Sequence, residues 1–209
     1  MGNRAIIKTK SGRIGMYLHW NGGRDSVEAF LEYCKLRGFR PPEVDGYGWA
    51  RLAQVVGNYF GGGLSVGIVE TTGDHDGEWC DNGAYVIENW EIVGREDFDG
   101  PEQKVYPLEK MLHDIDDAQP ESERLGEYLD AEEIPVSELT IGDTVVFWQG
   151  GLERMVRGEV RGIGEPWQVV NGHNVSDVPY VNLYGDSNGD FSNNINNYLF
   201  QETVRVLDR

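Results

Sequence analysis

The first 95 residues alternate short β-rich runs with two stretches of helical periodicity, and this alternation limits the possible fold more than any other feature. Residues 5–9 and 14–20 are β-rich and are separated by a polar tetrapeptide, which predicts a hairpin. Two further strands are predicted over residues 64–69 and 85–93. The second of these is expected to be bent or bulged, because its hydrophobic residues do not alternate strictly.

Two helices are predicted between the hairpin and the later strands. In the first, four hydrophobic residues recur at helical spacing: Val27, Phe30, Leu31 and Cys34. Asp25 and Glu28 have the spacing of a capping box at its start, and Gly38 supplies a stop. The second helix covers residues 49–59 and ends at a run of three glycines. The resulting order, ββααββ, predicts an α+β domain over residues 1–118.

The composition changes after residue 118. Residues 119–136 are rich in acidic side chains and predict a linker. Beyond it, residues 137–209 contain four β-rich runs separated by Gly, Asn and Asp, at residues 144–147, 157–162, 180–184 and 203–207. This spacing predicts a small C-terminal antiparallel β-barrel of the SH3-like kind.

The net charge of −18 is distributed unevenly along the chain. Residues 1–60 carry +4 and residues 141–209 carry −4, so residues 61–140, at −18, hold the whole acidic excess. An excess of this size disfavours binding of nucleic acid over a broad surface and favours a basic partner. Two interpretations stay open: a solvated acidic linker, and a surface that competes with phosphate backbones for a basic groove.

No motif assigns a catalytic site. The glycine run at residues 61–63 lacks the Lys-Ser/Thr of a phosphate-binding loop. Residues 186–190 resemble a calcium loop but lack its glycine and final glutamate, and residues 74–81 hold one His and one Cys without zinc-finger spacing. We therefore expect no catalytic residue, no metal and no cofactor. Three tryptophans are assigned to the first core rather than to a stacking platform: Trp20, Trp49 and Trp90.

Four stretches resemble a family of small proteins that bacterial phages and mobile elements carry: residues 15–31, 47–52, 57–62 and 81–93. This family is associated with anti-CRISPR proteins that inhibit type II Cas9 effectors. The resemblance covers residues 1–118 and leaves the barrel-like region outside. It implies a protein partner, a Cas9-type effector nuclease that can be guide-loaded, with nucleic acid present through the effector. Since no apolar run reaches membrane-spanning length and cysteines are few, a cytoplasmic location in the bacterial host is expected.

The resemblance and the charge distribution both predict a non-catalytic inhibitor. RNA-guided nucleases hold nucleic acid in positive channels, which a small acidic protein can occupy by offering carboxylates in place of phosphates. The residues expected to bind the partner form three acidic clusters: Asp74, Asp76, Glu78 and Asp81; Glu96, Asp97 and Asp99; Asp114, Asp116 and Asp117. The third cluster ends a helix predicted near residues 108–115. Acid there opposes the helix dipole, so this end is expected to fray or to pair with a basic group.

Two other functions stay open. The first is an adaptor that binds nucleic acid through the basic first 60 residues or through the barrel. The second is an enzyme or a sponge that acts on a defence signalling nucleotide, with Arg24 as its first candidate residue. Sequestration of a nucleotide needs a concave pocket with convergent polar and basic groups. The oligomeric state is left open.

Overall fold

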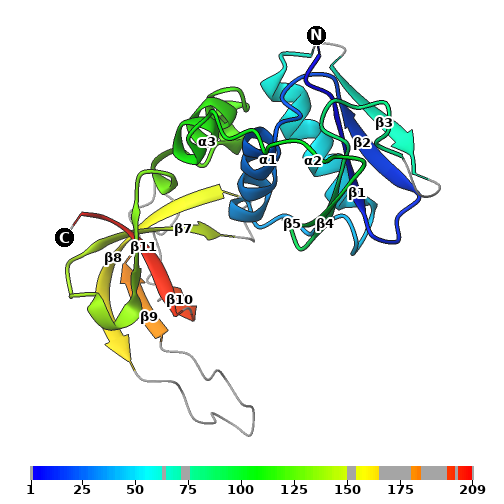
Figure 1. Ribbon diagram of the computed structural model, residues 1–209. Helices are drawn as coiled ribbons and strands as arrows, with labels where there is room; N and C mark the ends of the chain where they lie inside the picture. Colours follow the sequence, from blue (N-terminus) through cyan, green and yellow to red (C-terminus); the bar gives the residue numbers. More distant parts are fainter. Residues whose placement is uncertain are drawn as a thin grey trace, which may run out of the picture. The chain divides into compact units, whose positions relative to one another are not determined.

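The computed structural model describes residues 2–62, 65–71, 76–149, 154–164, 180–184, 197–200 and 202–208. The chain forms two compact units, Met1–Arg124 and Leu125–Arg209, and each unit contains one β-sheet (Figure 1). The fold is therefore mixed α+β. Among the described residues, no helix is both long and apolar enough to cross a membrane.

The first unit has a five-stranded sheet in the order β3-β2-β1-β4-β5. The strands are β1 (Ala5–Thr9), β2 (Ile14–Leu18), β3 (Val66–Glu70), β4 (Ala84–Glu88) and β5 (Glu91–Glu96). Strands β1 and β4 pair in parallel, and the other neighbours pair antiparallel. The hairpin predicted at the start of the chain is confirmed as β1 and β2.

The single bent strand predicted over residues 85–93 is wrong, because the chain reverses between β4 and β5. Asn89 and Trp90 both have positive φ angles, 50° and 65°. Positive φ at both central residues defines a type I′ turn, whose twist suits a hairpin and which usually contains Asn-Gly. Trp90 holds this conformation because its indole is buried, 4% exposed, and donates a 2.8 Å hydrogen bond to the Phe39 carbonyl.

Helices α1 (Arg24–Leu36) and α2 (Gly46–Tyr59) contact the sheet, and α3 (Leu108–Asp117) packs against α1 (Figure 1). The helices predicted in these regions are confirmed, and α1 ends before Gly38, whose φ is 65°. The predicted capping box is wrong, because Gly23 is the N-cap residue. The buried Asp25 carboxylate instead accepts backbone hydrogen bonds from Val105 and Tyr106, at 2.7 and 3.0 Å.

The second unit has a six-stranded antiparallel sheet in the order β10-β9-β8-β7-β11-β6. Its strands are β6 (Glu132–Pro135), β7 (Thr144–Gln149), β8 (Arg154–Gly164), β9 (Tyr180–Tyr184), β10 (Asn197–Phe200) and β11 (Thr203–Asp208). Among the described residues of this unit, nine buried hydrophobic residues form a core cluster: Ile134, Val136, Leu139, Val145, Phe147, Val160, Val181, Val204 and Val206. Within the described ranges, β10 and β6 are the outer strands, and no pairing closes the sheet into a barrel.

Residues 119–136, expected to form an acidic linker, are divided between the two units. The segment contains two short 3-10 helices, η1 (Glu121–Glu123) and η2 (Gly126–Tyr128), followed by the strand β6. A third 3-10 helix, η3 (Val136–Glu138), begins at the last residue of the segment. In the second unit, the Arg205 guanidinium lies 4.6 Å from the centre of the Tyr128 ring. Much of the segment therefore packs against the units on either side of residue 124.

Candidate functional site

The loop that follows β3 returns over one face of the first sheet, and its described part, residues 76–83, is called the return loop below. The strand register places Ile6 on this face with Tyr17 and Ala84, and Cys80 of the return loop packs against them. Gly77 lies so close to β4 that a Cβ atom there would be 2.5 Å from the Ala84 nitrogen. The return loop is therefore seated directly on the sheet.

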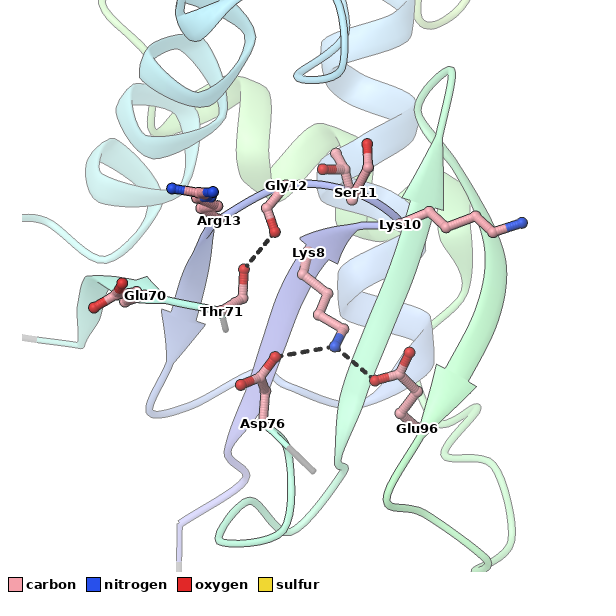
Figure 2. A pocket seen from close by; sticks show the side chains of 10 residues that line it. Lys8, Lys10, Ser11, Gly12, Arg13, Glu70, Thr71, Asp76 and Glu96 are labelled. Atoms are coloured by element: carbon pink, nitrogen blue, oxygen red, sulfur yellow. Dashed lines mark hydrogen bonds and ion pairs between the residues drawn. The ribbon is translucent and has the colours of Figure 1, made fainter. Parts of the chain in front are cut away.

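Lys8 of β1 holds one end of the return loop. Its Nζ lies 3.0 Å from Oδ2 of Asp76 and 2.6 Å from Oε2 of Glu96 at the end of β5 (Figure 2). The Lys8 side chain is 9% exposed. Burial disfavours its charged form, but the hydrogen bonds to Glu96 and Asp76 outweigh burial and raise the pKa of Lys8. Lys8 therefore stays protonated and joins the return loop to β5.

Arg4 holds the other end of the return loop. Its Nε donates to Oδ2 of Asp81 at 3.0 Å, a terminal nitrogen donates to Oδ1 at 3.2 Å, and its backbone N–H donates to Oδ2 at 3.0 Å. The side-chain hydrogen bond from Arg4, followed by the backbone one, lowers the pKa of Asp81 to about 2. These three hydrogen bonds fix the position of the loop beside β1.

Four rings from β2, its C-terminal extension and the return loop form a row that we call the aromatic surface: Trp79, Tyr17, His19 and Trp20. The centroids of Tyr17 and Trp79 are 5.0 Å apart, and those of His19 and Trp20 are 4.9 Å apart. The Tyr17 hydroxyl lies 2.7 Å from Nδ1 of His19 and joins the two pairs. Trp79 is 50% exposed and Trp20 is 44% exposed, so both indoles are available to a partner.

A polar pocket of about 500 Å³ opens beside the β1–β2 turn (Figure 2). Its lining comes from the turn, the end of β3, the return loop and β5: Lys8, Thr9, Lys10, Ser11, Gly12, Arg13, Glu70, Thr71, Asp76 and Glu96. The Thr71 hydroxyl donates a 3.0 Å hydrogen bond to the Gly12 carbonyl and fixes the turn. Three basic and three acidic side chains line the pocket, so it offers an anionic ligand no excess of positive charge.

The first two acidic clusters predicted from the sequence are split by the fold. Asp74 lies outside the described residues, and Asp76 and Glu96 share Lys8. Asp97 accepts a 3.0 Å hydrogen bond from the Gly77 N–H, and Asp81 binds Arg4.

Glu78 and Asp99 are exposed and have no ion-pair partner among the residues that the structure describes. The structure brings Glu78, Trp79 and Asp81 together on the return loop.

The third acidic cluster lies at the end of α3, which was expected either to fray or to pair with a basic group. The structure shows pairing. Asp114 binds Lys110 at 2.5 Å, and Asp117 lies 3.6 Å from Arg124. Asp116 is 5% exposed and accepts a 2.6 Å hydrogen bond from the Tyr33 hydroxyl. Asp116 therefore lies in the interior of the unit, where a partner protein cannot contact it.

The predicted place of Trp20 in the core is wrong, because Trp20 is exposed, while Trp49 and Trp90 are buried as predicted. Trp79 is not among the predicted site residues, although a tryptophan between Glu78 and Asp81 in a polar loop is a usable signal. Lys8 is not among them either, because no local signal marks it.

The remaining sequence candidates form no second site among the residues that the structure describes. Arg24 pairs with Glu28 at 2.5 Å and with Glu102 at 3.4 Å. Both cysteines are free and buried. Residues 186–190 and His75 lie outside the described residues. Within the described ranges, no group of three His, Cys, Asp or Glu side chains is placed to hold a metal ion.

Comparison with known proteins does not assign this chain to a family. No protein-family model matches it, and the searches of the curated proteins and of the solved structures each returned no match. The function is therefore argued from the residues and their geometry.

Proposed function

We propose that this protein is a non-catalytic, phage-encoded inhibitor of a bacterial defence nuclease, with a guide-loaded Cas9-type effector as its target. It acts in the cytoplasm of the bacterial host, where such an effector works. The first unit binds the effector through the return loop and the aromatic surface, and it competes there with nucleic acid. The second unit, proposed to be a small SH3-like barrel, adds to the acidic field of the whole chain.

One observation carries this proposal: the return loop is held at both ends and presents exposed side chains between them. Asp76 and Asp81 bind Lys8 and Arg4 of the β1 region. Glu78 and Trp79, between these anchors, point to solvent. A loop that is already ordered loses little conformational entropy when it binds, and exposed tryptophans are enriched among residues that dominate binding energies.

The charge of the chain fits a basic partner. A net charge of −18 attracts a positive channel over distances of about 10 Å, and salt screens this attraction. Carboxylates at the surface then occupy positions where a channel otherwise holds phosphates. Glu78 and Asp99 are available without the loss of an internal ion pair, and Asp81 is an exposed residue of the same return loop as Glu78.

The pocket does not favour a nucleotide sponge. A nucleotide carries one or more phosphates, and a site for it needs an excess of donors and positive charge. Here Lys8 is already shared by Asp76 and Glu96, and the three acidic side chains of the described lining equal its three basic ones in number. The surface of the return loop therefore supports the inhibitor better than the pocket supports sequestration.

The test is size-exclusion chromatography of the full chain with a panel of Cas9–guide complexes at about 50 and about 200 mM salt, followed by target-DNA binding. We expect co-elution with one complex, weaker at the higher salt, and loss of DNA binding. Glu78→Lys should weaken the complex, while Glu109→Lys, the same charge change at an exposed position of α3, should weaken it much less. Absence of co-elution with every effector would overturn the proposal.

A further inference from the structure

We propose that the aromatic surface is a site for guanidinium groups, so the partner contributes arginine side chains that stack on Trp79 and Trp20. Glu78 pairs with the same guanidinium that lies on Trp79. The inference rests on the proposed function and states which chemical group of the partner binds the aromatic surface.

The rings are held in place before any partner binds. Tyr17 packs against the cluster of Ile6, Cys80 and Ala84, and its ring supports Trp79 at an interplanar angle of 40°. His19 meets Trp20 edge to face, at 87°. Because each exposed indole contacts a ring from β2 or its extension, this contact restricts the rotation of the indole before a partner binds. Such restriction lowers the entropy cost of stacking.

Cations are the groups that the aromatic surface attracts. The face of an indole is electron-rich, and tryptophan binds cations more strongly than the other aromatic side chains do. Glu78 precedes Trp79 in the chain and adds negative charge, while the charge of Asp81, two residues after Trp79, is offset by Arg4. Nucleobases also stack on aromatic rings, but their phosphates would meet these carboxylates in a protein of net charge −18.

Arginine stacks on rings elsewhere in the chain. The Arg95 guanidinium lies 4.1 Å from the centre of the Tyr85 ring and 3.7 Å from that of Phe98. Arg40 lies 5.4 Å from the centre of the Tyr47 ring. In contrast, no Lys or Arg of the described chain lies over Trp79 or Trp20. These two indoles are therefore free to accept a cation from a partner.

Arginine is preferred to lysine for a geometric reason. A guanidinium is planar, so it can lie flat on an indole while its edge donates two parallel hydrogen bonds to a carboxylate. An ammonium group is compact and strongly hydrated, and it cannot make both contacts in this way. Glu78, next to Trp79 in the chain, supplies the carboxylate.

The experiment titrates the full chain with two short peptides of equal length and charge, one alternating Gly with Arg and the other Gly with Lys. Binding is followed by tryptophan fluorescence and calorimetry at about 150 mM salt, with a single-stranded oligonucleotide as a third probe. We expect the Arg peptide to bind about tenfold more tightly than the Lys peptide, and the oligonucleotide not to bind. Equal affinity for the two peptides, or preference for the oligonucleotide, would overturn the proposal.

Two variants locate the site. Trp79→Ala should reduce affinity for the Arg peptide about tenfold, and Glu78→Gln should remove part of the preference for Arg over Lys. Tyr47→Ala is the matched control, because Tyr47 is 66% exposed on α2 and lies outside the aromatic surface. Circular dichroism verifies that each variant is folded. Unchanged affinity in folded Trp79→Ala would contradict the proposal.

The same variants separate this inference from the proposed function. If the Arg peptide binds through Trp79 but no effector co-elutes, the guanidinium site stands and the nuclease target is wrong. If an effector co-elutes equally with the wild type and with Trp79→Ala, the target stands and the guanidinium site is wrong.

Discussion

The Tyr33 hydroxyl donates a 2.6 Å hydrogen bond to Oδ1 of Asp116 in the interior of the first unit, and this contact joins α1 to α3. Burial, together with the neighbouring Asp116 carboxylate, raises the pKa of Tyr33. The hydroxyl therefore remains a donor throughout the physiological range. An aspartate that belongs to an acidic cluster in the sequence thus acts as a structural acceptor.

Tyr33→Phe removes this donor and leaves a buried carboxylate with one hydrogen bond fewer. We expect a loss of about 2 kcal/mol in the free energy of unfolding, measured by urea titration with circular dichroism. Tyr47→Phe is the control, because Tyr47 is exposed, and its effect should lie within about 0.5 kcal/mol of zero. Equal effects of the two substitutions would show that the Tyr33–Asp116 contact contributes nothing.

Asp81 should titrate near pH 2, and its pairing with Arg4 should set this value. The pKa is lowered on folding, so the stabilisation by this pair is complete above the ordinary carboxyl value of 3.8. It is lost as the pH falls through the folded value of about 2. Carboxyl NMR checks this directly. In Arg4→Gln the pKa should return towards 3.8, and an unchanged value would exclude Arg4 as the cause.

Lys8→Met should destabilise the first unit, because it leaves Asp76 and Glu96 close together without a cation between them. We expect a loss of about 2 kcal/mol, less than for a fully buried pair, since Glu96 is partly exposed. Lys10→Met makes the same change two residues further along the chain, at an exposed residue of the β1–β2 turn, and should cost little. If both variants unfold at the same urea concentration, Lys8 does not anchor the return loop.

The pH dependence of the Lys8 contribution has a defined sign. The pKa of Lys8 is raised on folding, so its stabilisation is fully present below the ordinary lysine value of 10.5. The stabilisation is lost as the pH rises through the higher folded value. Unfolding curves of wild type and Lys8→Met should therefore differ at pH 7 and converge in strong alkali.

Gly77→Ala should displace the return loop, because the added Cβ would lie 2.5 Å from the Ala84 nitrogen. We expect a lower urea midpoint and weaker binding of the Arg peptide, since Trp79 moves with the loop. Gly57→Ala is the control: nothing lies within 4 Å of a Cβ at Gly57 in α2, and alanine favours helix by up to about 1 kcal/mol. A neutral Gly77→Ala would show that the loop is not seated on β4.

Much of the first unit could be predicted from the sequence because the signals are local. Hydrophobic periodicity marks α1 and α2, and Gly38 marks the end of α1. The turn at Asn89 and Trp90 could not be predicted, because a tryptophan at positive φ is stabilised by contacts with distant residues rather than by its own preference. Similarly, β6 and β10 were overlooked, because both are four-residue strands with little alternation.

The candidate site also combines features that are visible in the sequence with features that depend on the fold. The amino-acid sequence establishes the net charge, its concentration between residues 61 and 140, and the presence of Trp79 among acidic residues. Which carboxylates face solvent depends on the folded chain, because Arg4 lies 77 residues from Asp81 and Lys8 lies 68 residues from Asp76. Pairing of this kind depends on how the sheet brings distant segments together. The residue type alone therefore does not distinguish a carboxylate that is paired inside the fold from one that is presented to a partner.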